Sequence, residues 1–301
     1  MSDDTSISSD KNLLIFAYVP TGFGHLRVTD ALYDSCPNKE NSVIFESEDK
    51  TITYLHRIMS VHPLLRAIFE WVQQDVPEDL FAYFYKKNLR SSTKVIYNQL
   101  SAIIKSKKIR FHESIIIIAT HFFLAHKIAA IKPQLEHEFK LKLYLFLQVT
   151  DDSPQHIWYV PEANIIFVPS LYTKEKLLEY KEKNNLAKTT IEIIPYPISS
   201  ILRKPLSDIE YKERTSQYDP VLETKIKVKV PISGAAVGMN YFKKIIPELY
   251  QISNRFEFEI VSKKTLRTQY FLNYLRKYEF VNLHVFEKDR EVVDFYERIY
   301  D

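Results

Sequence analysis

Gly22, Gly24 and His25 form a short segment that could take part in chemistry. The chain has only 4 glycines among 301 residues, whereas proteins average about 7% glycine, so each glycine is expected to meet a backbone need. Glycine permits a positive φ and a close approach to a ligand, and a helix N-terminus after such a turn suits phosphate or a developing anion. His25 could act there as a base or a donor.

The same residues also fit a plain strand-to-helix turn with a surface histidine. The dinucleotide fingerprint GxGxxG is not met, because Arg27 stands where its third glycine belongs. A dinucleotide-dependent oxidoreductase is therefore not expected.

Two carboxylates and a second histidine follow the predicted strand 141–150. Asp151, Asp152 and His156 lie just past its carboxyl end, which is where ligands bind in open α/β sheets. An aspartate and a histidine five residues later could form an acid–base or orienting pair. Alternatively, Asp152 and Ser153 cap a helix or turn, and His156 is structural.

A second pair of glycines, Gly234 and Gly238, follows the predicted strand 225–231 and precedes a predicted helix. This turn could bind phosphate or simply pack the helix against the strand. The strand alternates charged and apolar residues, so one of its faces is expected to meet solvent.

The positive charge is concentrated in residues 81–110, which hold eight Lys and Arg, no Asp or Glu, and interleaved aromatic residues. This composition suits an anionic membrane surface better than nucleic acid, although a solvated helix face is the plainer alternative. The residues expected to contact the membrane are Trp71, Lys86, Lys87, Arg90, Lys107 and Lys108.

Several classes of protein are not expected. The single cysteine, Cys36, excludes an internal disulfide and argues against a zinc cluster, and no metal-binding or serine-hydrolase motif is present. The polar N-terminus lacks the features of a signal peptide, and no apolar run approaches the roughly 18 residues of a membrane span. We expect a cytoplasmic protein without a bound metal.

Apolar runs alternate with helix-like stretches along the whole chain, which predicts the α/β class with parallel sheets. We expect an N-terminal domain over 1–202, a polar linker over 203–224 and a partial C-terminal domain over 225–301. The predicted strands cover 12–19, 41–47, 114–120, 141–150, 163–170, 190–198, 225–231, 256–262 and 281–286.

Several segments together resemble one family. Residues 21–32, TGFGHLRVTDAL, resemble the TGxGHxxxAxAL start of lipid-modifying glycosyltransferases such as monogalactosyldiacylglycerol synthase and the processive diacylglycerol glucosyltransferase; the peptidoglycan N-acetylglucosaminyltransferase is a more distant relative. Residues 149–179 resemble the family's segment in which a threonine–aspartate pair is followed by a histidine and then by a tryptophan. Residues 191–198 and 232–239 resemble the end of its first domain and the glycine turn of its second.

The resemblance implies the GT-B fold, with two Rossmann-like domains, and metal-independent, inverting transfer of a sugar from a nucleotide sugar to a lipid acceptor. The acceptor and the membrane would lie against the first domain, and the nucleotide against the second, without any cofactor. Either a histidine or an aspartate would remove the acceptor's proton. By resemblance, His25 and Asp151 are catalytic, Gly22, Gly24, His156 and Trp158 bind substrate, and Gly234 and Gly238 bind the nucleotide sugar.

The chain also departs from this family. Tyr196 stands where members usually have glycine, and Ala235 and Ala236 stand where they often do. The family's later donor-binding motifs are absent, so the second domain is expected to be incomplete. A non-catalytic module that binds the lipid or acceptor remains an alternative, and a nucleotide-sugar epimerase on the same fold is a third. The expected location is the cytoplasmic side of a membrane, held peripherally.

Overall fold

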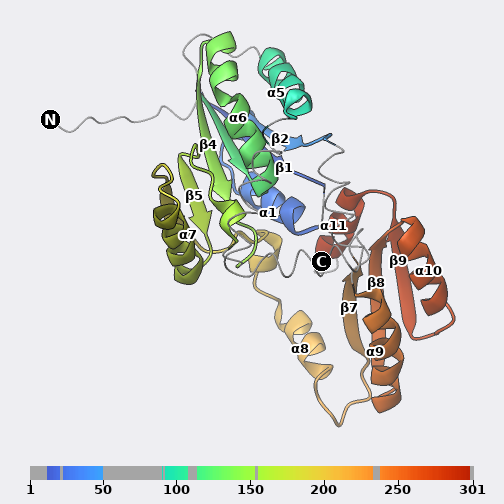
Figure 1. Ribbon diagram of the computed structural model, residues 1–301. Coiled ribbons are helices and arrows are strands. Elements are labelled where there is room, and N and C mark those ends of the chain that lie inside the picture. The colour runs from blue at the N-terminus through green and yellow to red at the C-terminus, as the bar shows by residue number, and fades with distance from the viewer. Residues whose placement is uncertain are drawn as a thin grey trace. The chain divides into compact units, whose positions relative to one another are not determined.

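The computed structural model describes residues 12–20, 23–49, 90, 92–107, 114–152, 155–232 and 238–298. They belong to two compact units: residues 1–20 with 24–199, and residues 21–23 with 200–301 (Figure 1). Six residues predicted to form sites lie outside the described residues: Gly22, Trp71, Lys86, Lys87, Lys108 and Gly234.

The first unit is built on a six-stranded sheet in which every neighbouring pair is parallel. The strand order is β2-β1-β3-β4-β5-β6, so the direction of winding reverses between β1 and β3. In doubly wound folds, such a switch point is where ligands bind. The strands are β1 Leu13–Tyr18, β2 Ser42–Glu46, β3 Ser114–Ala119, β4 Lys142–Gln148, β5 Ile165–Val168 and β6 Thr190–Ile193.

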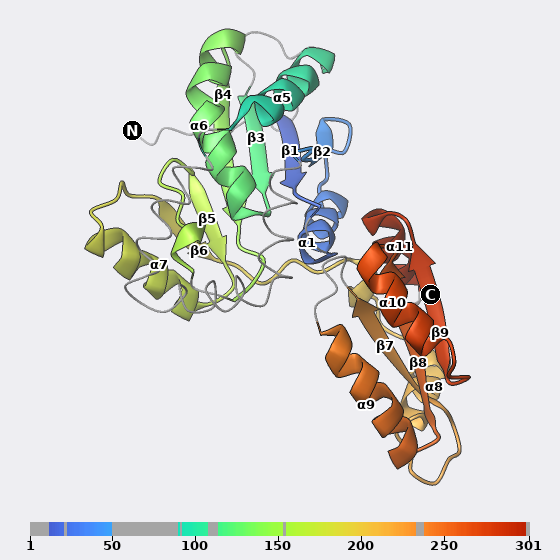
Figure 2. The same ribbon diagram turned by 45° about the vertical axis from the view of Figure 1, so that its right-hand side comes forward.

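Both faces of this sheet carry helices. On β1, Phe16 packs its ring against Tyr33 of α1, with centroids 5.8 Å apart. Ile15 and Ala17 point to the opposite face and join a buried core that includes residues of α5 and α6, two helices that lie side by side (Figure 2). The helices are α1 Phe23–Asp34, α5 Lys94–Ser106, α6 Phe122–Phe139 and α7 Leu171–Lys183.

Two residues other than glycine take up left-handed backbone conformations in this glycine-poor chain. Lys140 ends α6 with a φ of 51°, and Asn185 follows α7 with a φ of 47°. Glycine usually occupies such helix-ending positions. The left-handed turns after these two helices are thus made without glycine.

The second unit has a smaller parallel sheet in the order β7-β8-β9. Its apolar core lies between this sheet and the helices α9 and α10. The predicted α/β class, with a second and smaller parallel sheet, is therefore confirmed. The elements are β7 Ile226–Ile232, α9 Met239–Ile252, β8 Phe256–Lys263, α10 Leu266–Leu275, β9 Val281–Phe286 and α11 Asp289–Arg298.

The other face of the smaller sheet is polar, as the alternation along β7 predicted. Lys227 and Lys229 lie in register with Glu257 and Glu259 of β8. Glu259 also accepts a hydrogen bond of 2.9 Å from the Asn282 amide of β9. Opposite charges on neighbouring strands stabilise a sheet, so this face needs little apolar cover.

The segment 203–224, predicted to be a polar linker, contains the helix α8, Asp208–Ser216. Ser207 accepts from the Glu210 backbone N–H while Glu210 accepts from the Ser207 N–H, which forms a capping box. No residue of α8 is buried. The segment lacks a clear apolar period because this helix has no core-facing side, so periodicity did not reveal the helix.

A buried ion pair holds together three parts of the first unit. Lys127 of α6 and Asp49, just after β2, have side chains that are 1% and 3% exposed. The Lys127 ammonium donates to the Asp49 carboxylate and to the Ser92 carbonyl, just before α5, and lies 4.9 Å from the centre of the Phe123 ring. A buried ammonium is stable only when it is paired in this way.

Substituting Lys127→Ala is expected to lower the free energy of unfolding by about 3–5 kcal/mol, because the Asp49 carboxylate would stay buried without its partner. Urea unfolding followed by circular dichroism measures the change. Lys176→Ala is the matched control, since it removes a lysine from an exposed helical ion pair worth at most about 1 kcal/mol. Equal losses in the two variants would contradict this account.

Candidate functional site

His25 lies at the carboxyl edge of the first sheet, in the first turn of α1. The helix begins at Phe23, earlier than the predicted start near Leu26. The segments that follow β1, β3 and β4 meet around the His25 ring, which is the switch point described above. The predicted position of His25 at this edge is therefore confirmed.

Two partners of His25 Nδ1 determine where the ring carries its proton. Nδ1 lies 2.8 Å from the Thr120 carbonyl oxygen and 3.0 Å from Thr150 Oγ1. A carbonyl oxygen can only accept, so Nδ1 bears the hydrogen and shares it between the two oxygens. In the neutral ring, the lone pair is then on Nε2.

Further contacts hold the start of α1 against the end of β3. Thr29 Oγ1 donates to the His25 carbonyl over 2.8 Å and lies 2.9 Å from Thr120 Oγ1. The His121 ring stands with its centroid 4.4 Å from that of His25. Thr29, Thr120 and His121 are buried, so they leave the His25 ring little freedom.

Sequence analysis did not single out Thr120 or Thr150 as site residues. What marks them in the sequence is their place at the end of a strand. Thr120 follows β3 directly, and Thr150 comes two residues after β4. Threonine is common at such places for many reasons, so the role of these two residues becomes visible only when the strands pair.

The two described glycines differ in backbone conformation. Gly238, at the start of α9, has a φ of 78°, and a Cβ there would approach the Phe242 ring to 3.5 Å. Gly24 is helical without a positive φ, and a Cβ built on it would meet no heavy atom within 4 Å. Gly24 thus makes no use of the positive φ that glycine permits, because the helix starts early, whereas Gly238 does.

The neighbouring carboxylates Asp151 and Asp152 have different surroundings. Asp152 Oδ1 accepts hydrogen bonds from Ser170 Oγ over 2.6 Å and Thr173 Oγ1 over 2.7 Å, and these bonds lower the pKa of Asp152. Ser170 is also the N-cap of α7. The alternative in which Asp152 caps a helix or turn agrees with its bonds to the start of α7.

Tyr196 was noted in the sequence only as a departure from the family pattern. Its side chain reaches the segment that follows β4. Its hydroxyl donates to the Thr150 carbonyl oxygen over 3.0 Å. The pKa of Tyr196 is raised because burial and the negative charge of Asp151 disfavour the phenolate, while the charge of Arg27 acts in the opposite direction. Asp151 and Arg27 therefore both lie close enough to influence the phenol.

His156 and Trp158, which were expected to bind substrate, pack against aromatic neighbours. Trp158 is 0% exposed, and its ring meets Phe122 edge-on with centroids 5.1 Å apart. The His156 ring stacks on Tyr180, with centroids 4.2 Å apart and planes 17° from parallel. The alternative in which His156 is structural agrees with this contact.

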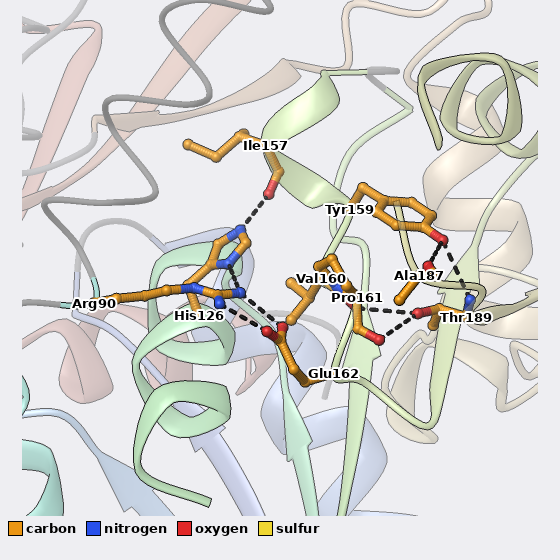
Figure 3. A network of polar contacts seen from close by, with 9 residues as sticks. All are labelled: Arg90, His126, Ile157, Tyr159, Val160, Pro161, Glu162, Ala187 and Thr189. Carbon is orange, nitrogen blue, oxygen red and sulfur yellow. Dashed lines mark hydrogen bonds and ion pairs between the residues drawn. The ribbon is translucent and has the colours of Figure 1, made fainter. Parts of the chain in front are cut away.

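A polar network anchors the loop that contains these residues (Figure 3). Arg90 donates to both carboxylate oxygens of Glu162 at 2.7 Å, and one of its nitrogens lies 3.4 Å from His126 Nδ1. His126 Nε2 donates to the Ile157 carbonyl over 2.9 Å. Arg90, which was predicted to contact a membrane, forms a bidentate ion pair within the protein; its membrane contact stays a prediction.

A second group of bonds anchors the other end of the loop (Figure 3). Tyr159 donates to the Ala187 carbonyl over 2.7 Å, and Thr189 Oγ1 donates to the Pro161 carbonyl over 2.9 Å. The loop between β4 and β5 is thus fixed to α6 on one side and to the segment before β6 on the other.

Two further observations concern the described ranges only. They contain no group of three or more His, Cys, Asp or Glu side chains that could hold a metal ion. Of the helices in these ranges, none is long and apolar enough to cross a lipid bilayer.

No family model matches the chain, and no curated protein matches it. Among solved structures, it is similar to S. aureus MnaA with UDP, at a TM-score of 0.48 and 10% identity over 96% of this chain and 72% of that one. It is also similar to UDP-GlcNAc 2-epimerase from Neisseria meningitidis bound to UDP-GlcNAc (TM-score 0.45, 12% identity, 95% and 75% covered). A third similar structure is a UDP-forming α,α-trehalose-phosphate synthase from Burkholderia vietnamiensis (TM-score 0.41, 12% identity, 95% and 76% covered).

Substituting Asp152→Asn is expected to destabilise the protein near neutral pH. Because folding lowers the pKa of this carboxyl, its ionised form stabilises the native state above the ordinary value near 3.8, and this contribution is lost as the pH falls through the lowered pKa. The difference in unfolding free energy between the wild type and the variant should therefore shrink below that pH.

Urea titrations at a series of pH values measure this difference. Glu192→Gln, which neutralises an exposed carboxylate on β6, is the control and should show little effect at any pH. A destabilisation of Asp152→Asn that is independent of pH would refute the assignment.

Proposed function

We propose that the chain is a metal-independent, inverting glycosyltransferase that moves a sugar from a nucleotide sugar, such as a UDP-sugar, to a lipid acceptor such as diacylglycerol. The observation that carries this proposal is the setting of His25 at the switch point of the first sheet. Its Nδ1 proton is held by the Thr120 carbonyl and Thr150 Oγ1, so the neutral ring presents a basic Nε2.

In the proposed reaction, Nε2 of His25 takes the proton from the acceptor hydroxyl as its oxygen attacks the anomeric carbon of the donor. The new carbon–oxygen bond forms while the bond to the nucleotide phosphate breaks, so the nucleotide diphosphate leaves and the configuration inverts. The Asp151 carboxylate, next to Thr150 in the chain, would stabilise the positive charge that His25 gains.

The second unit offers a place for the diphosphate. Gly238 begins α9, a helix of 14 residues, and the start of a helix favours bound phosphate. The proposal assigns nucleotide binding to this glycine turn, including Gly234, and acceptor binding to the first unit. A non-catalytic module that binds lipid or acceptor is the second candidate, favoured by alanines at 235 and 236 where the family often has glycine.

Calorimetric titration of the chain with UDP, the nucleotide named in the MnaA structure, separates these candidates. The transferase proposal expects saturable binding that Gly238→Ala weakens, because an alanine at that φ is strained. No binding of UDP, together with binding of vesicles that contain diacylglycerol, would favour the non-catalytic module.

His25→Ala and Asp151→Ala are each expected to lower kcat for sugar transfer by about 10²-fold or more, the scale on which acid–base catalysis acts. Product formation from a radiolabelled UDP-sugar measures the rate. His137→Ala, which removes an exposed histidine late in α6, is the matched control and should keep the wild-type rate. Wild-type rates in both site variants would disprove the assignment.

The membrane part of the proposal rests on the basic segment 81–110. Replacing Lys86, Lys87, Lys107 and Lys108 by glutamine should weaken binding to anionic vesicles by roughly 1 kcal/mol for each charge, and binding should fall as salt is added. Vesicle co-sedimentation measures it. A variant with the exposed lysines 183, 188, 212 and 244 replaced is the control, and equal binding to neutral and anionic vesicles would argue against the assignment.

A further inference from the structure

Tyr196 connects the end of the first unit to His25 through one intervening residue. It lies three residues after β6 and four residues before Ser200, where the second unit begins. Its hydroxyl donates to the Thr150 carbonyl over 3.0 Å, and Thr150 Oγ1 lies 3.0 Å from His25 Nδ1. Since β5 stands between β4 and β6 in the sheet, Tyr196 reaches past the end of a whole strand to make this bond.

We propose that Tyr196 is a positioning residue, which holds the backbone of Thr150 so that the Thr150 hydroxyl keeps the Nδ1 proton of His25 in place. The part of this inference that concerns catalytic rate rests on the proposed function. The part that concerns the hydrogen bonds of His25 Nδ1 does not.

The properties of the Tyr196 side chain suit this task. Its pKa is raised, first by burial and then by the charge of Asp151, so the phenol stays protonated and remains a donor at neutral and mildly alkaline pH. The residue as a whole is 41% exposed, so the contact with Thr150 is local and is not part of the core. Replacing tyrosine by phenylalanine would remove the hydrogen bond and leave the ring.

The Thr150 carbonyl is held by Tyr196, while its side chain faces His25. Without the Tyr196 bond, the segment after β4 could shift and Thr150 Oγ1 would leave Nδ1. The Thr120 carbonyl would remain an acceptor for the Nδ1 proton, and a carbonyl can only accept, so Nδ1 would stay protonated. We expect Nδ1 to lose one of its two acceptors and the His25 ring to be held less firmly.

The experiment is ¹⁵N NMR of histidine side chains in the full chain, with the His25 signals identified by their loss in His25→Ala. In the wild type, the shifts should report a protonated Nδ1. Tyr196→Phe should leave Nδ1 protonated but change its ¹⁵N shift, because the Nδ1–H group loses one of its two acceptors. The matched control is Tyr172→Phe on α7, a tyrosine that is 56% exposed, and it should leave the His25 signals unchanged.

If transfer activity is present, Tyr196→Phe should also lower kcat by roughly 3- to 10-fold, the scale of one hydrogen bond, with KM for the nucleotide sugar unchanged. Thr150→Val, which removes the hydroxyl at the next link, should move the His25 signals in the same direction. The double variant should then shift them no further than Thr150→Val alone, because the two residues act through one path.

Unchanged His25 signals in Tyr196→Phe would overturn the inference, and so would fully additive effects of the two substitutions. A failure of the proposed function looks different. The chain would then show no sugar transfer, while the ¹⁵N shift of His25 Nδ1 would still change in Tyr196→Phe.

Discussion

The parallel pairing of β1 with β3 is the constraint on which the candidate site depends. β1 is followed by a connection toward β2 on one side of it, while the chain after β3 moves to β4 on the other side. In doubly wound folds, ligands bind at the carboxyl ends of the strands where the order reverses in this way. The start of α1 and the segments after β3 and β4 come together there, and His25 meets Thr120 and Thr150.

The polar contacts at this edge have a direction that follows from simple donor and acceptor rules. A backbone carbonyl accepts at His25 Nδ1, so the proton must reside on that nitrogen. The same rule applies to His126, where the Ile157 carbonyl requires the proton on Nε2. Each imidazole is therefore given a defined tautomer by a carbonyl from a different part of the chain.

One buried and one partly exposed ion pair also hold the surrounding segments. Lys127 joins α6 to the end of β2 and to the residue before α5, and Arg90 joins the segment before α5 to the loop between β4 and β5. Lys127 contacts Asp49 and Ser92, on either side of residues 50–89, and Arg90 directly follows them. Isolated surface charges would contribute little, whereas these two pairs tie distant segments to the sheet that carries His25.

The sequence by itself determined the α/β class, most of the strands, and the placement of His25 and Asp151 just beyond strand ends. These features follow from local patterns, because apolar runs and their periods report which residues face a core. The early start of α1, which removed the expected positive φ of Gly24, and the unburied helix α8 were not readable in this way. Each depends on contacts or exposure that a local period does not encode.

Only the tertiary structure decided which hydrogen-bond partners the individual residues of these segments have. Asp151 and Asp152 are adjacent and chemically equal, and Ser170, 18 residues away, distinguishes them by bonding to Asp152. Glu162 engages Arg90 from 72 residues away, and Tyr196 reaches Thr150 across 46 residues. A hydrogen bond depends on distance in space and not on separation along the chain, so these assignments became visible only when the strands were paired.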